Sequence, residues 1–426
     1  MPAGTRSSAE RVNAERLSAD ITALGRFGAT DRGGVNRPVY SPADLAARGW
    51  LADRCAEAGL GFRTDAIGNC FITLPGSDPN RARVWTGSHI DTVPDGGRLD
   101  GAFGVLAGLE CLRTLAAADD DFRPSATVEV VAFADEEGAY ASFVGSRALV
   151  DGWTVDALSA LTGRDGEPLA DGLARIGSSI EAAAEVPTIT AAAGAGRGAV
   201  AAFVELHIEQ GPVLENAGLD IGVVTDIVEV GHGTVTFLGQ ADHAGTTPME
   251  LRRDATRAAG AFLVGLPSVP AEHGSPAAVA TCGMVSVEPG AANIVVEEMR
   301  LSLDVRDRAG GVPSLQAGVA DLARRCSADH GLDHRLEWDS VTPGVALDPD
   351  MGQRVADAAD RIGASHHRMV SGAGHDSQVM ARAVPTGMIF VPSENGRSHS
   401  PAESTSLAQL EIGANVLLEV LRDLAS

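Results

Sequence analysis

Hydrophobic and polar positions alternate along the chain in two rhythms, which predict helices in some segments and strands in others. Residues 11–27 and 41–60 have apolar positions at helical spacing, and the second run begins at Ser-Pro and ends near Gly. Strand-like runs follow at 61–76, 82–90 and 125–134, with the helix-like stretch GVLAGLECLRTLAAA between the last two. A strand, a helix and a strand at this spacing predict a βαβ unit and a parallel sheet.

The remaining part of this α/β pattern lies in two later segments. Residues 151–200 are rich in Ala and Gly and predict helices joined by loops, and 199–208 predicts a buried strand. Near the C-terminus a helix is expected at 350–362, a strand at 386–392 and a closing helix at 406–424. The fold class expected is α/β, with a mixed, largely parallel sheet and helices on both faces.

A different rhythm runs from about residue 221 to residue 341. The expected order is strand, helix, strand, strand, helix, strand, which is typical of a ferredoxin-like βαββαβ unit. We therefore expect a discontinuous α/β domain formed by 1–220 and 342–426, with a second domain inserted at 221–341. The six predicted elements of the insert are 225–239, 255–266, 278–289, 293–307, 314–328 and 333–341.

Composition and charge narrow the classes of partner. The chain has 426 residues, enough for two or three domains, and 44% of them are hydrophobic, enough for a sizeable core. All 33 cationic residues are Arg, against 57 acidic residues, so the net charge is −24. Such a charge disfavours nucleic acids and anionic membranes as partners. An anionic substrate would need a local Arg, His or metal ion.

The sequence also bears on the cellular compartment. No apolar run reaches the roughly 18 residues of a membrane span, and the N-terminal stretch MPAGTRSSAERVNAERL lacks the apolar region of a signal peptide. The five cysteines are odd in number and form no CxxC motif. We therefore expect free thiols and a cytoplasmic protein. The cysteines are Cys55, Cys70, Cys111, Cys282 and Cys326.

Five short segments concentrate residues that can bind metals or move protons. Four of them follow predicted strands of the α/β pattern, where the loops of a parallel sheet form its site. Their residues of interest are His89, Asp91 and Asp100; Asp135, Glu136 and Glu137; His207 and Gln210; His243; and His399.

The first segment suggests both a metal ligand and its support. A metal-binding imidazole usually donates its other N–H to a carboxylate, and Asp91 is close enough in sequence to accept it from His89. Asp100 follows a Gly-rich turn, and its carboxylate is suited to bridging two cations. The alternative is that Asp100 only caps the helix that begins there.

Three adjacent carboxylates at 135–137 repel one another unless cations neutralise them. A natural division makes Glu136 a general base and Glu137 a metal ligand, although a solvated acidic loop is the alternative. A lone His in an apolar strand, such as His207, is more often a core residue, and His399 lies in a polar loop. Taken together, these His and carboxylate residues fit a two-metal hydrolase.

Other common motifs are disfavoured. Residues 194–199 match G-x-G-x-x-A, but a strand-like run follows them instead of a helix, so a dinucleotide-binding fold is not expected. The sequence has no GxSxG elbow, no Walker A motif and no HExxH motif.

Several longer segments share a recognisable pattern over nearly the whole chain. They are GGVNRPVYSPADLAARGW, GSHIDTVPDGGRLDGAFGV, DEEGA followed by GSRAL, ELHIEQGPVLE, GQADHAGTTPMELRRDA, SGAGHDSQ and VPSENGRSHSPAE. With them the chain resembles the dinuclear-metal amidohydrolases of the aminoacylase/carboxypeptidase type. HIEQGP and HAGTTPM point to the hydantoinase/carbamoylase branch, which contains N-carbamoyl-L-amino acid hydrolases, allantoate amidohydrolases, ureidoglycolate-type enzymes and β-ureidopropionases.

The resemblance implies two divalent metal ions and their ligands. One ion would be held by His89, Asp100 and His207, and the other by Asp100, Glu137 and His399, with Asp100 bridging the two. Zinc or manganese is expected, and cobalt or nickel also suits these ligands.

It also implies roles for residues around the metals. Glu136 would be the general base, and His243, on a lid formed by the inserted domain, would polarise the scissile carbonyl, in some dimers within the partner's site. Gln210 would contact the substrate, while Asn293 and Arg306 would hold its α-carboxylate. Without the resemblance, Arg306 would be taken for a surface strand residue and Asn293 for a turn residue.

Three departures from the family pattern stand out. AYASF at 139–143 replaces a Ser-Arg-Phe-like stretch after the acidic residues, which alters a wall near the base. Asn293 is followed by IVVEE instead of a close Pro-Gly. His232 stands where an Arg-Tyr pair is more usual, and we expect it to be a surface residue of the lid.

The activity implied is metal-dependent cleavage of the ureido C–N bond of an N-carbamoyl-L-amino acid or related ureido acid, giving the amino acid, ammonia and carbon dioxide. Allantoate hydrolysis is one alternative, and hydrolysis of an N-acyl amino acid or dipeptide is another. A non-catalytic binding protein on the same fold is a third. The expected partners are a small-molecule substrate and a second copy of the chain, paired through the lid at strand 293–307.

Overall fold

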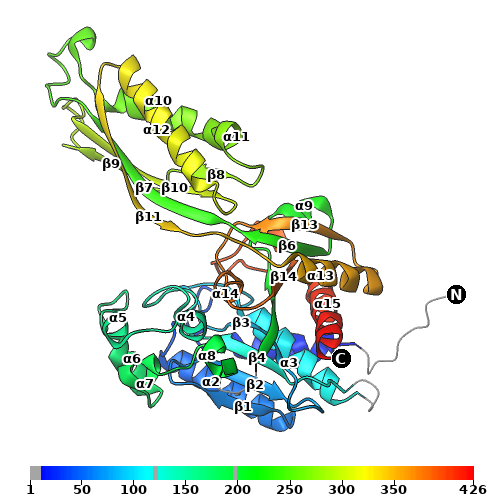
Figure 1. The fold of residues 1–426 in the computed structure, drawn as a ribbon. Coiled ribbons are helices and arrows are strands. Elements are labelled where there is room, and N and C mark those ends of the chain that lie inside the picture. Colours follow the sequence, from blue (N-terminus) through cyan, green and yellow to red (C-terminus); the bar gives the residue numbers. More distant parts are fainter. Residues whose placement is uncertain (1–10, 119–122, 195–198) are drawn as a thin grey trace. The chain divides into compact units, whose positions relative to one another are not determined.

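The computed structural model describes residues 11–118, 123–194 and 199–426, which form two compact units (Figure 1). The second unit comprises residues 226–346 and 370–374, and the rest belongs to the first. It begins a few residues later than the expected 221, because residues 222–224 pair with residues 388–390 in the sheet of the first unit. Most of the glycine-rich stretch at 194–199 lies outside the described residues.

The first unit contains most of a nine-stranded mixed sheet. The central strands β4, β3, β5 and β14 are parallel, and the strands that flank them run antiparallel to their neighbours. This confirms the expected α/β class. The order is β1 (Gly61–Thr64), β2 (Cys70–Leu74), β4 (Val128–Phe133), β3 (Arg83–His89), β5 (Val200–Ile208), β14 (Thr386–Val391), β6 (Ile221–Ile227) and β12 (Val345–Ala346), with β13 (His366–Ser371) also paired to β6.

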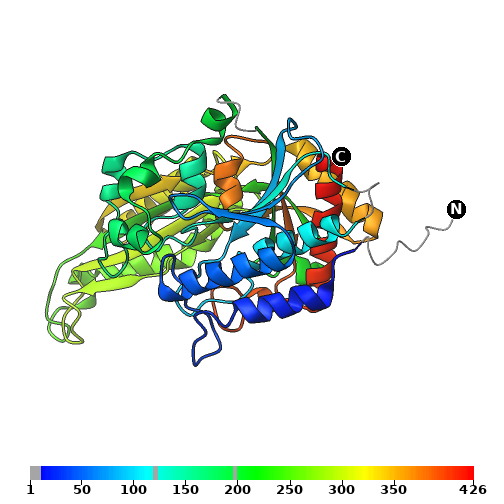
Figure 2. The same cartoon turned by 90° about the horizontal axis from the view of Figure 1, so that it is seen from below.

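Both faces of this sheet are buried, because alternate residues of the central strands enter two different cores. In β5, Ala202, Val204 and Leu206 join one core, whereas Phe203 joins the other. Figure 2 shows helices packed along the sheet. The near-continuous apolar character of the strands follows from this double burial.

The helices of the first unit divide between the two cores. The described part of the Ala- and Gly-rich run, residues 151–194, forms short helices, as expected, and apolar residues of these helices enter the second core. The first core receives α1 (Ala14–Leu24), α2 (Pro42–Glu57), α3 (Ala102–Ala116), α13 (Pro349–Ile362) and α15 (Leu407–Ala425). The second receives α4 (Val144–Val150), α5 (Val155–Ser159), α6 (Leu169–Arg175), α7 (Ile180–Ala184), α8 (Ile189–Gly194) and α14 (Asp376–Met380). The short α9 (Val213–Ala217) follows β5.

The second unit is an antiparallel sheet with helices packed on it, in the expected βαββαβ order. Its strands are β11 (Asp333–Thr342), β7 (Glu229–Leu238) and β10 (Glu298–Asp307), with β8 (Val279–Thr281) and β9 (Val285–Glu288) both on the far side of β10. Its helices are α10 (Ala255–Gly265), α11 (Val269–His273) and α12 (Val312–Asp329).

Four expectations for this region are wrong in detail. The run at 225–239 contains parts of two strands, β6 and β7, which belong to different sheets. The run at 278–289 is split into β8 and β9, and β10 begins only at Glu298. Most importantly, β10 pairs on both sides, so segment 293–307 is not a free sheet edge. The edges are β11 and the β8–β9 pair.

Among the helices that the structure describes, none is both long and apolar enough to cross a membrane.

Candidate active site with a metal-binding cluster

The ends of four parallel strands bring the candidate metal ligands together in the first unit. His89 is the last residue of β3, Glu137 follows β4, His207 lies near the end of β5, and His399 lies in the loop after β14. Because the carboxyl ends of parallel strands meet at one edge of a sheet, residues over 300 positions apart become neighbours. Asp100 joins them from the turn before α3.

The carboxylate of Asp100 is the centre of the cluster. Its Oδ1 lies 3.2 Å from Nε2 of His207, and its Oδ2 lies 3.1 Å from Nε2 of His399. Burial alone would raise the pKa of Asp100, but its hydrogen bonds with the two imidazoles hold that pKa well below the usual value. Asp100 is therefore an anion that faces two imidazoles at once.

The tautomer of His89 is set by a backbone carbonyl. Its Nδ1 lies 2.9 Å from the carbonyl oxygen of Asp91 and donates to it, which leaves a lone pair on Nε2. The expected partner was the carboxylate of Asp91, but its Oδ1 is 3.9 Å away. Oδ2 instead accepts the backbone N–H of Glu137 at 3.2 Å, so Asp91 positions the acidic loop.

His207 is held in the same way. Its Nδ1 donates to the carbonyl of Ile208 at 2.8 Å, and its Nε2 accepts the N–H of Gly101 at 3.1 Å. Nε2 of His207 thus lies beside the anionic Asp100, a position that a proton or a cation on this nitrogen would stabilise. Burial lowers the pKa of His207, but its hydrogen bond with Asp100 and the Asp100 and Glu205 charges outweigh this and raise it to about 9.

The acidic loop adds two buried carboxyl groups. Burial, reinforced by neighbouring carboxylates, raises the pKa of Glu137 to about 8 and that of Glu136 well above its usual range. Oε1 of Glu137 has no hydrogen-bond partner and lies 3.5 Å from Nε2 of His399. Oε2 of Glu136 lies 3.6 Å from Nε2 of His89.

These donors fit divalent metal ions. The ligand atoms of His89, Asp100 and His207 lie within 4.8 Å of one another, and so do those of Asp100, Glu137 and His399. The two groups share Asp100. Imidazole nitrogens and carboxylate oxygens are ligands that zinc and manganese accept. A cation in each group would relieve the repulsion between the carboxylates. The cation in the second group would also bind the unpartnered Oε1 of Glu137.

Strained backbone positions shape the cluster. Asp135, Gln210 and His399 have φ values of 57°, 60° and 53°, a region that residues other than Gly rarely adopt. Gly101 has a φ of 62°, and a Cβ there would collide with the imidazole of His89. The glycine therefore allows α3 to begin directly beneath a candidate ligand.

Gln210 lies within the same cluster. Its Nε2 donates to both carboxylate oxygens of Asp100 at 3.1 Å and to Oγ of Ser398 at 3.3 Å. Its predicted contact with substrate remains a proposal, because its amide here faces a candidate ligand.

Two acidic residues support the cluster in a way that was not predicted from the sequence. Glu403 accepts the backbone N–H groups of Leu99 and Asp100 at 2.8 and 3.1 Å, which holds the turn that carries Asp100. Asp135 accepts the N–H groups of residues 139–141 at 2.6, 3.0 and 3.1 Å and so closes the acidic loop. Both residues stood in segments already singled out, but a supporting carboxylate has no distinctive sequence signal.

A buried layer behind His207 was also missed. The ring of His375 packs edge-on against that of His207, with centroids 4.6 Å apart. Glu205 accepts hydrogen bonds from the hydroxyls of Ser88 and Ser377, each at 2.7 Å. Although Glu205, His207 and His375 are close enough to hold an ion, Nδ1 of His207 is already bonded to a carbonyl. This layer therefore braces His207.

The remaining predicted residues lie in the second unit. Nδ1 of the exposed His243 accepts the N–H groups of Gly245 and Thr246 at 3.0 and 3.2 Å, so the proton of a neutral ring lies on Nε2. The carbonyl of Asn293 accepts the N–H of Ala244 at 2.9 Å, which makes Asn293 a neighbour of His243.

Arg306 is held by Asp304. Its Nε and Nη2 donate to the two carboxylate oxygens of Asp304, both at 2.9 Å, and its Nη1 donates to the carbonyl of Gly372 at 2.8 Å. Of the five N–H groups of a guanidinium, one therefore remains on each Nη atom. The exposed His232 is a second neighbour of Asp304, with its Nε2 3.3 Å from Oδ2 of that carboxylate.

Comparisons with known proteins identify the family of the chain. A profile described as peptidase family M20/M25/M40 matches residues 85–423. The N-carbamoyl-L-amino-acid amidohydrolase of Paenarthrobacter aurescens is 35% identical over 422 residues, which cover 97% of this chain and 99% of that relative. The allantoate amidohydrolase of Escherichia coli (strain K12) is 37% identical over 410 residues, 94% of this chain and 96% of the relative.

A solved structure is similar over the same length. The crystal structure of a hydantoinase/carbamoylase family amidase from Burkholderia multivorans has a TM-score of 0.89 and 36% sequence identity, covering 98% of this chain and 99% of that one. The chain therefore belongs to the M20/M25/M40 peptidase family and, within it, to the hydantoinase/carbamoylase amidases.

Proposed function

We propose that the protein is a metal-dependent amidohydrolase that cleaves the ureido C–N bond of an N-carbamoyl-L-amino acid or a closely related ureido acid. The products would be the amino acid, ammonia and carbon dioxide. One observation carries the chemistry: two His/carboxylate groups share Asp100, and the carboxyl group of Glu136 lies beside them. The names of the relatives at about 35% identity support the substrate class.

In this proposal His89, Asp100 and His207 hold one divalent ion, and Asp100, Glu137 and His399 hold the other. The pair would be zinc or manganese, with cobalt or nickel as alternatives. When bound, such ions lower the pKa of water and polarise a carbonyl. The donor set and the unpartnered oxygen of Glu137 support the assignment.

Glu136 is proposed as the general base. It would take a proton from the attacking water and deliver it to the leaving nitrogen. Its buried position, 3.6 Å from Nε2 of His89, supports this role. Burial and the neighbouring carboxylates favour its protonated form, and a bound cation would favour the carboxylate that a base requires.

Residues of the second unit are proposed to bind the substrate. His243 would donate its Nε2–H to the scissile carbonyl oxygen, where negative charge develops. The two remaining N–H groups of Arg306 suit a carboxylate, and Asn293 would add an amide contact. Gln210, from the first unit, would reach the substrate once cations hold Asp100.

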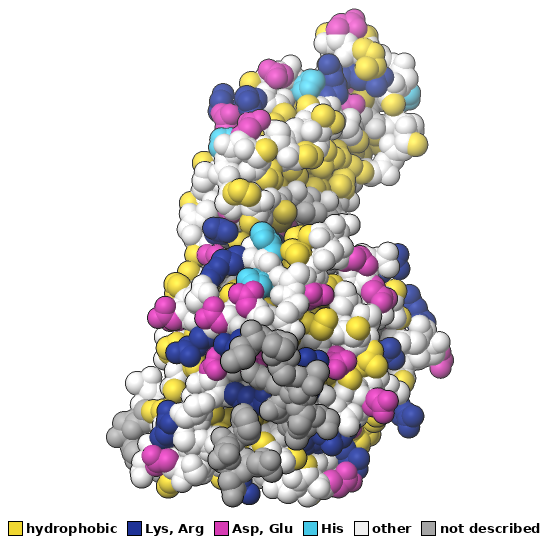
Figure 3. All heavy atoms as spheres, turned by 90° about the vertical axis from the view of Figure 1, so that its right-hand side faces the viewer, with side chains coloured by type: hydrophobic (Ala, Val, Ile, Leu, Met, Phe, Trp, Pro, Cys, Tyr) yellow, Lys and Arg dark blue, Asp and Glu magenta, His cyan; other side chains and the backbone are white. Residues whose placement is uncertain are grey.

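The protein is also proposed to be a homodimer in the cytoplasm. Hydrophobic side chains gather on part of the second unit (Figure 3). Val285 and Val287 of the short strand β9 are 54% and 39% exposed at a sheet edge, which is a common pairing surface. A single species with the mass of one chain in sedimentation at micromolar concentration would contradict the dimer. Five free cysteines suit a reducing compartment.

Allantoate is the second candidate substrate, because a relative of comparable identity carries that name. Allantoate also contains a ureido group on a carbon that bears a carboxylate. The same cluster and the same Arg306 would therefore serve it.

The deciding measurement is ammonia release by manganese- or zinc-loaded protein. The panel contains N-carbamoyl-L-amino acids, their D-enantiomers, allantoate, N-carbamoyl-β-alanine, N-acetyl-amino acids and dipeptides, the last two classes being followed by amine release. Faster turnover of an L-ureido acid than of its D-enantiomer is expected. Turnover of only acyl or peptide compounds would replace the proposal with an acylase or dipeptidase, and no turnover with metal bound would favour a binding protein.

A further inference from the structure

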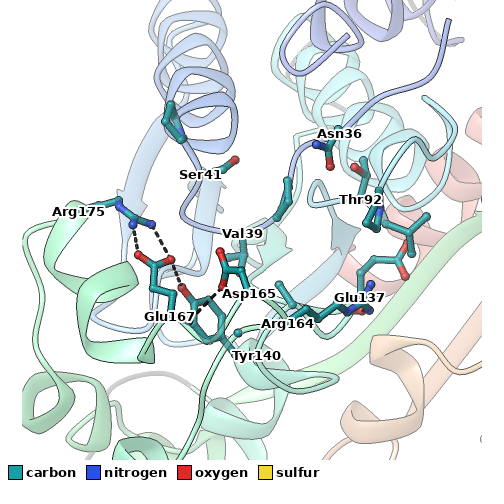
Figure 4. Close-up of a pocket in the computed structure, with 16 residues that line it drawn as sticks. Asn36, Val39, Ser41, Thr92, Glu137, Tyr140, Arg164, Asp165, Glu167 and Arg175 are labelled. Carbon is teal, nitrogen blue, oxygen red and sulfur yellow. Dashed lines mark hydrogen bonds and ion pairs between the residues drawn. The ribbon is translucent and has the colours of Figure 1, made fainter. Parts of the chain in front are cut away.

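A pocket of about 520 Å³ opens beside the candidate metal ligands in the first unit (Figure 4). Glu137 and Thr92 line one side of it, and Tyr140, Glu167 and Arg175 line the other. Its volume lies within the range of about 300–1,000 Å³ that small-molecule sites have. Because Glu137 belongs to the cluster and also lines the pocket, the two adjoin each other.

Hydrogen bonds hold the outer wall of the pocket in place. The hydroxyl of Tyr140 donates to Oε2 of Glu167 at 3.0 Å, and Arg175 binds the same carboxylate. The N–H of Gly163 donates to the carbonyl of Glu167 at 2.7 Å, and the N–H of Arg164 donates to that of Ala139 at 3.2 Å. These bonds tie the loop at 162–168 to the turn at 139–141, which Asp135 holds from below.

The charges of the lining disfavour an ionic occupant. Three carboxylates, those of Glu137, Asp165 and Glu167, stand against the two guanidinium groups of Arg164 and Arg175. Arg175 is paired with Glu167, and Arg164 is anchored through Nη2 to the carbonyl of Glu137 at 3.0 Å. With Glu137 committed to the proposed metal ligands, the carboxylates of Asp165 and Glu167 balance the guanidinium groups of Arg164 and Arg175, so neither an anion nor a cation would meet a net opposite charge.

The rest of the lining favours an apolar occupant. Prolines, valines and an alanine form much of the surface between the polar groups, among them Pro38, Val39, Val93, Pro94 and Ala139. The half-buried ring of Tyr140 adds an aromatic face to the lining. Its hydroxyl is already bonded to Glu167, so the ring itself is what an occupant would contact.

We propose that this pocket is the specificity subsite for the α-substituent of the ureido acid, and that it selects large uncharged side chains, aliphatic or aromatic. This inference rests on the proposed function and adds to it. The segment AYASF at 139–143 supplies Ala139 and Tyr140 to the lining. In this proposal AYASF, which departs from the family pattern, determines which α-substituents the pocket accepts.

The test compares kcat/KM for N-carbamoyl-L-phenylalanine with kcat/KM for N-carbamoylglycine. Ala139→Phe fills the pocket, and Ala141→Phe is the matched control, because Ala141 belongs to the same turn but does not line the pocket. The wild type should prefer the phenylalanine derivative. Ala139→Phe should lower the ratio by about tenfold or more, a typical effect of a mismatch in an apolar pocket, and Ala141→Phe should leave it within about twofold.

A second variant guards against misfolding. Pro94→Phe fills the pocket from the exposed rim on a different loop, and it should lower the ratio in the same direction. An unchanged ratio in a folded pocket-filling variant, with an active wild type, would overturn the subsite and leave the proposed function intact. An equal loss of both substrates in both pocket-filling variants would also overturn it. A wild type that hydrolyses no ureido compound would overturn the proposed function, and the subsite with it.

Discussion

The carboxylate of Asp100 lies 3.2 and 3.1 Å from imidazole nitrogens of His207 and His399. Backbone carbonyls accept the Nδ1 protons of His89 and His207, so that the Nε2 atoms face carboxylates. Such a cluster carries an electrostatic cost, because Asp100, Glu136 and Glu137 bring buried carboxyl groups close together. Cations would remove that cost, which is the physical reason to propose metal ions here.

The role of Glu136 is a prediction at this scale. Glu136→Gln should keep the fold and bind the same metal content, because Glu136 is not among the proposed ligands. Turnover should fall by a factor of about 10² to 10⁴, the usual contribution of a general base. Metal analysis and kcat on the best ureido substrate provide the measurement.

Glu137→Gln is the matched comparison for that variant, since it makes the same chemical change one residue away. It should lose metal as well as turnover. If Glu136→Gln retained its turnover, another group would have to be the base. If it lost metal as Glu137→Gln does, Glu136 would instead be a ligand.

At the scale of elements, the site depends on where strands end and where helix α3 begins. The turn before α3 carries Asp100, and Glu403 holds that turn by accepting two of its backbone N–H groups. Gly101, the N-cap residue of α3, adopts a φ of 62° and has no room for a side chain. The hydrogen bonds to Glu403 and the lack of a side chain at Gly101 thus hold Asp100 opposite His207 and His399.

Gly101→Ala should therefore displace the imidazole of His89 and weaken metal binding by at least about tenfold. Gly177→Ala is the control: Gly177 also has a positive φ, of 74°, but nothing lies within 4 Å of the added Cβ. Both variants should lose about 1 kcal/mol or more of stability from backbone strain. Isothermal titration with zinc or manganese separates the two, and equal metal affinity in both variants would contradict the steric argument.

At the scale of the whole molecule, the metal cluster joins segments that are over 300 residues apart in the sequence, from His89 to His399. The donors belong to the first unit, whereas His243, Asn293 and Arg306 belong to the second. A ligand that binds such a cluster only in the folded state adds to its stability by mass action.

Removal of metal should therefore lower the unfolding temperature of the first unit. At a free metal concentration about 1,000 times Kd, the loss would be about 4 kcal/mol. Calorimetry before and after chelation, then after restoring zinc or manganese, measures the change. The unfolding temperature of His399→Ala should change much less on chelation, because this variant lacks one proposed metal ligand. An unfolding temperature that ignores chelation in the wild type would argue against the cluster as a metal site.

Much of this arrangement was predictable from local patterns. Apolar runs with period two or 3.6 depend only on neighbouring residues, and they predicted β3, β5, α3 and α15. The carboxylate of Asp91 was wrongly expected to support His89, because sequence spacing cannot say whether a backbone carbonyl lies closer. The edge position expected of 293–307 was wrong for a similar reason. The partners of a strand are long-range contacts, and β10 pairs with β7 on one side and with β8 and β9 on the other.

Periodicity and motifs are local properties of the chain, and they were enough to predict the fold class, the family resemblance and which residue types stand at the ends of strands. The folded chain was needed to show which nitrogen of each His faces Asp100, that Glu403 and Asp135 hold the two loops, and that Asp304 binds Arg306. It also showed that residues 139–140 and 163–167 contribute to one pocket. Those features depend on side chains and loops brought together from distant segments, where distance and burial set the energies.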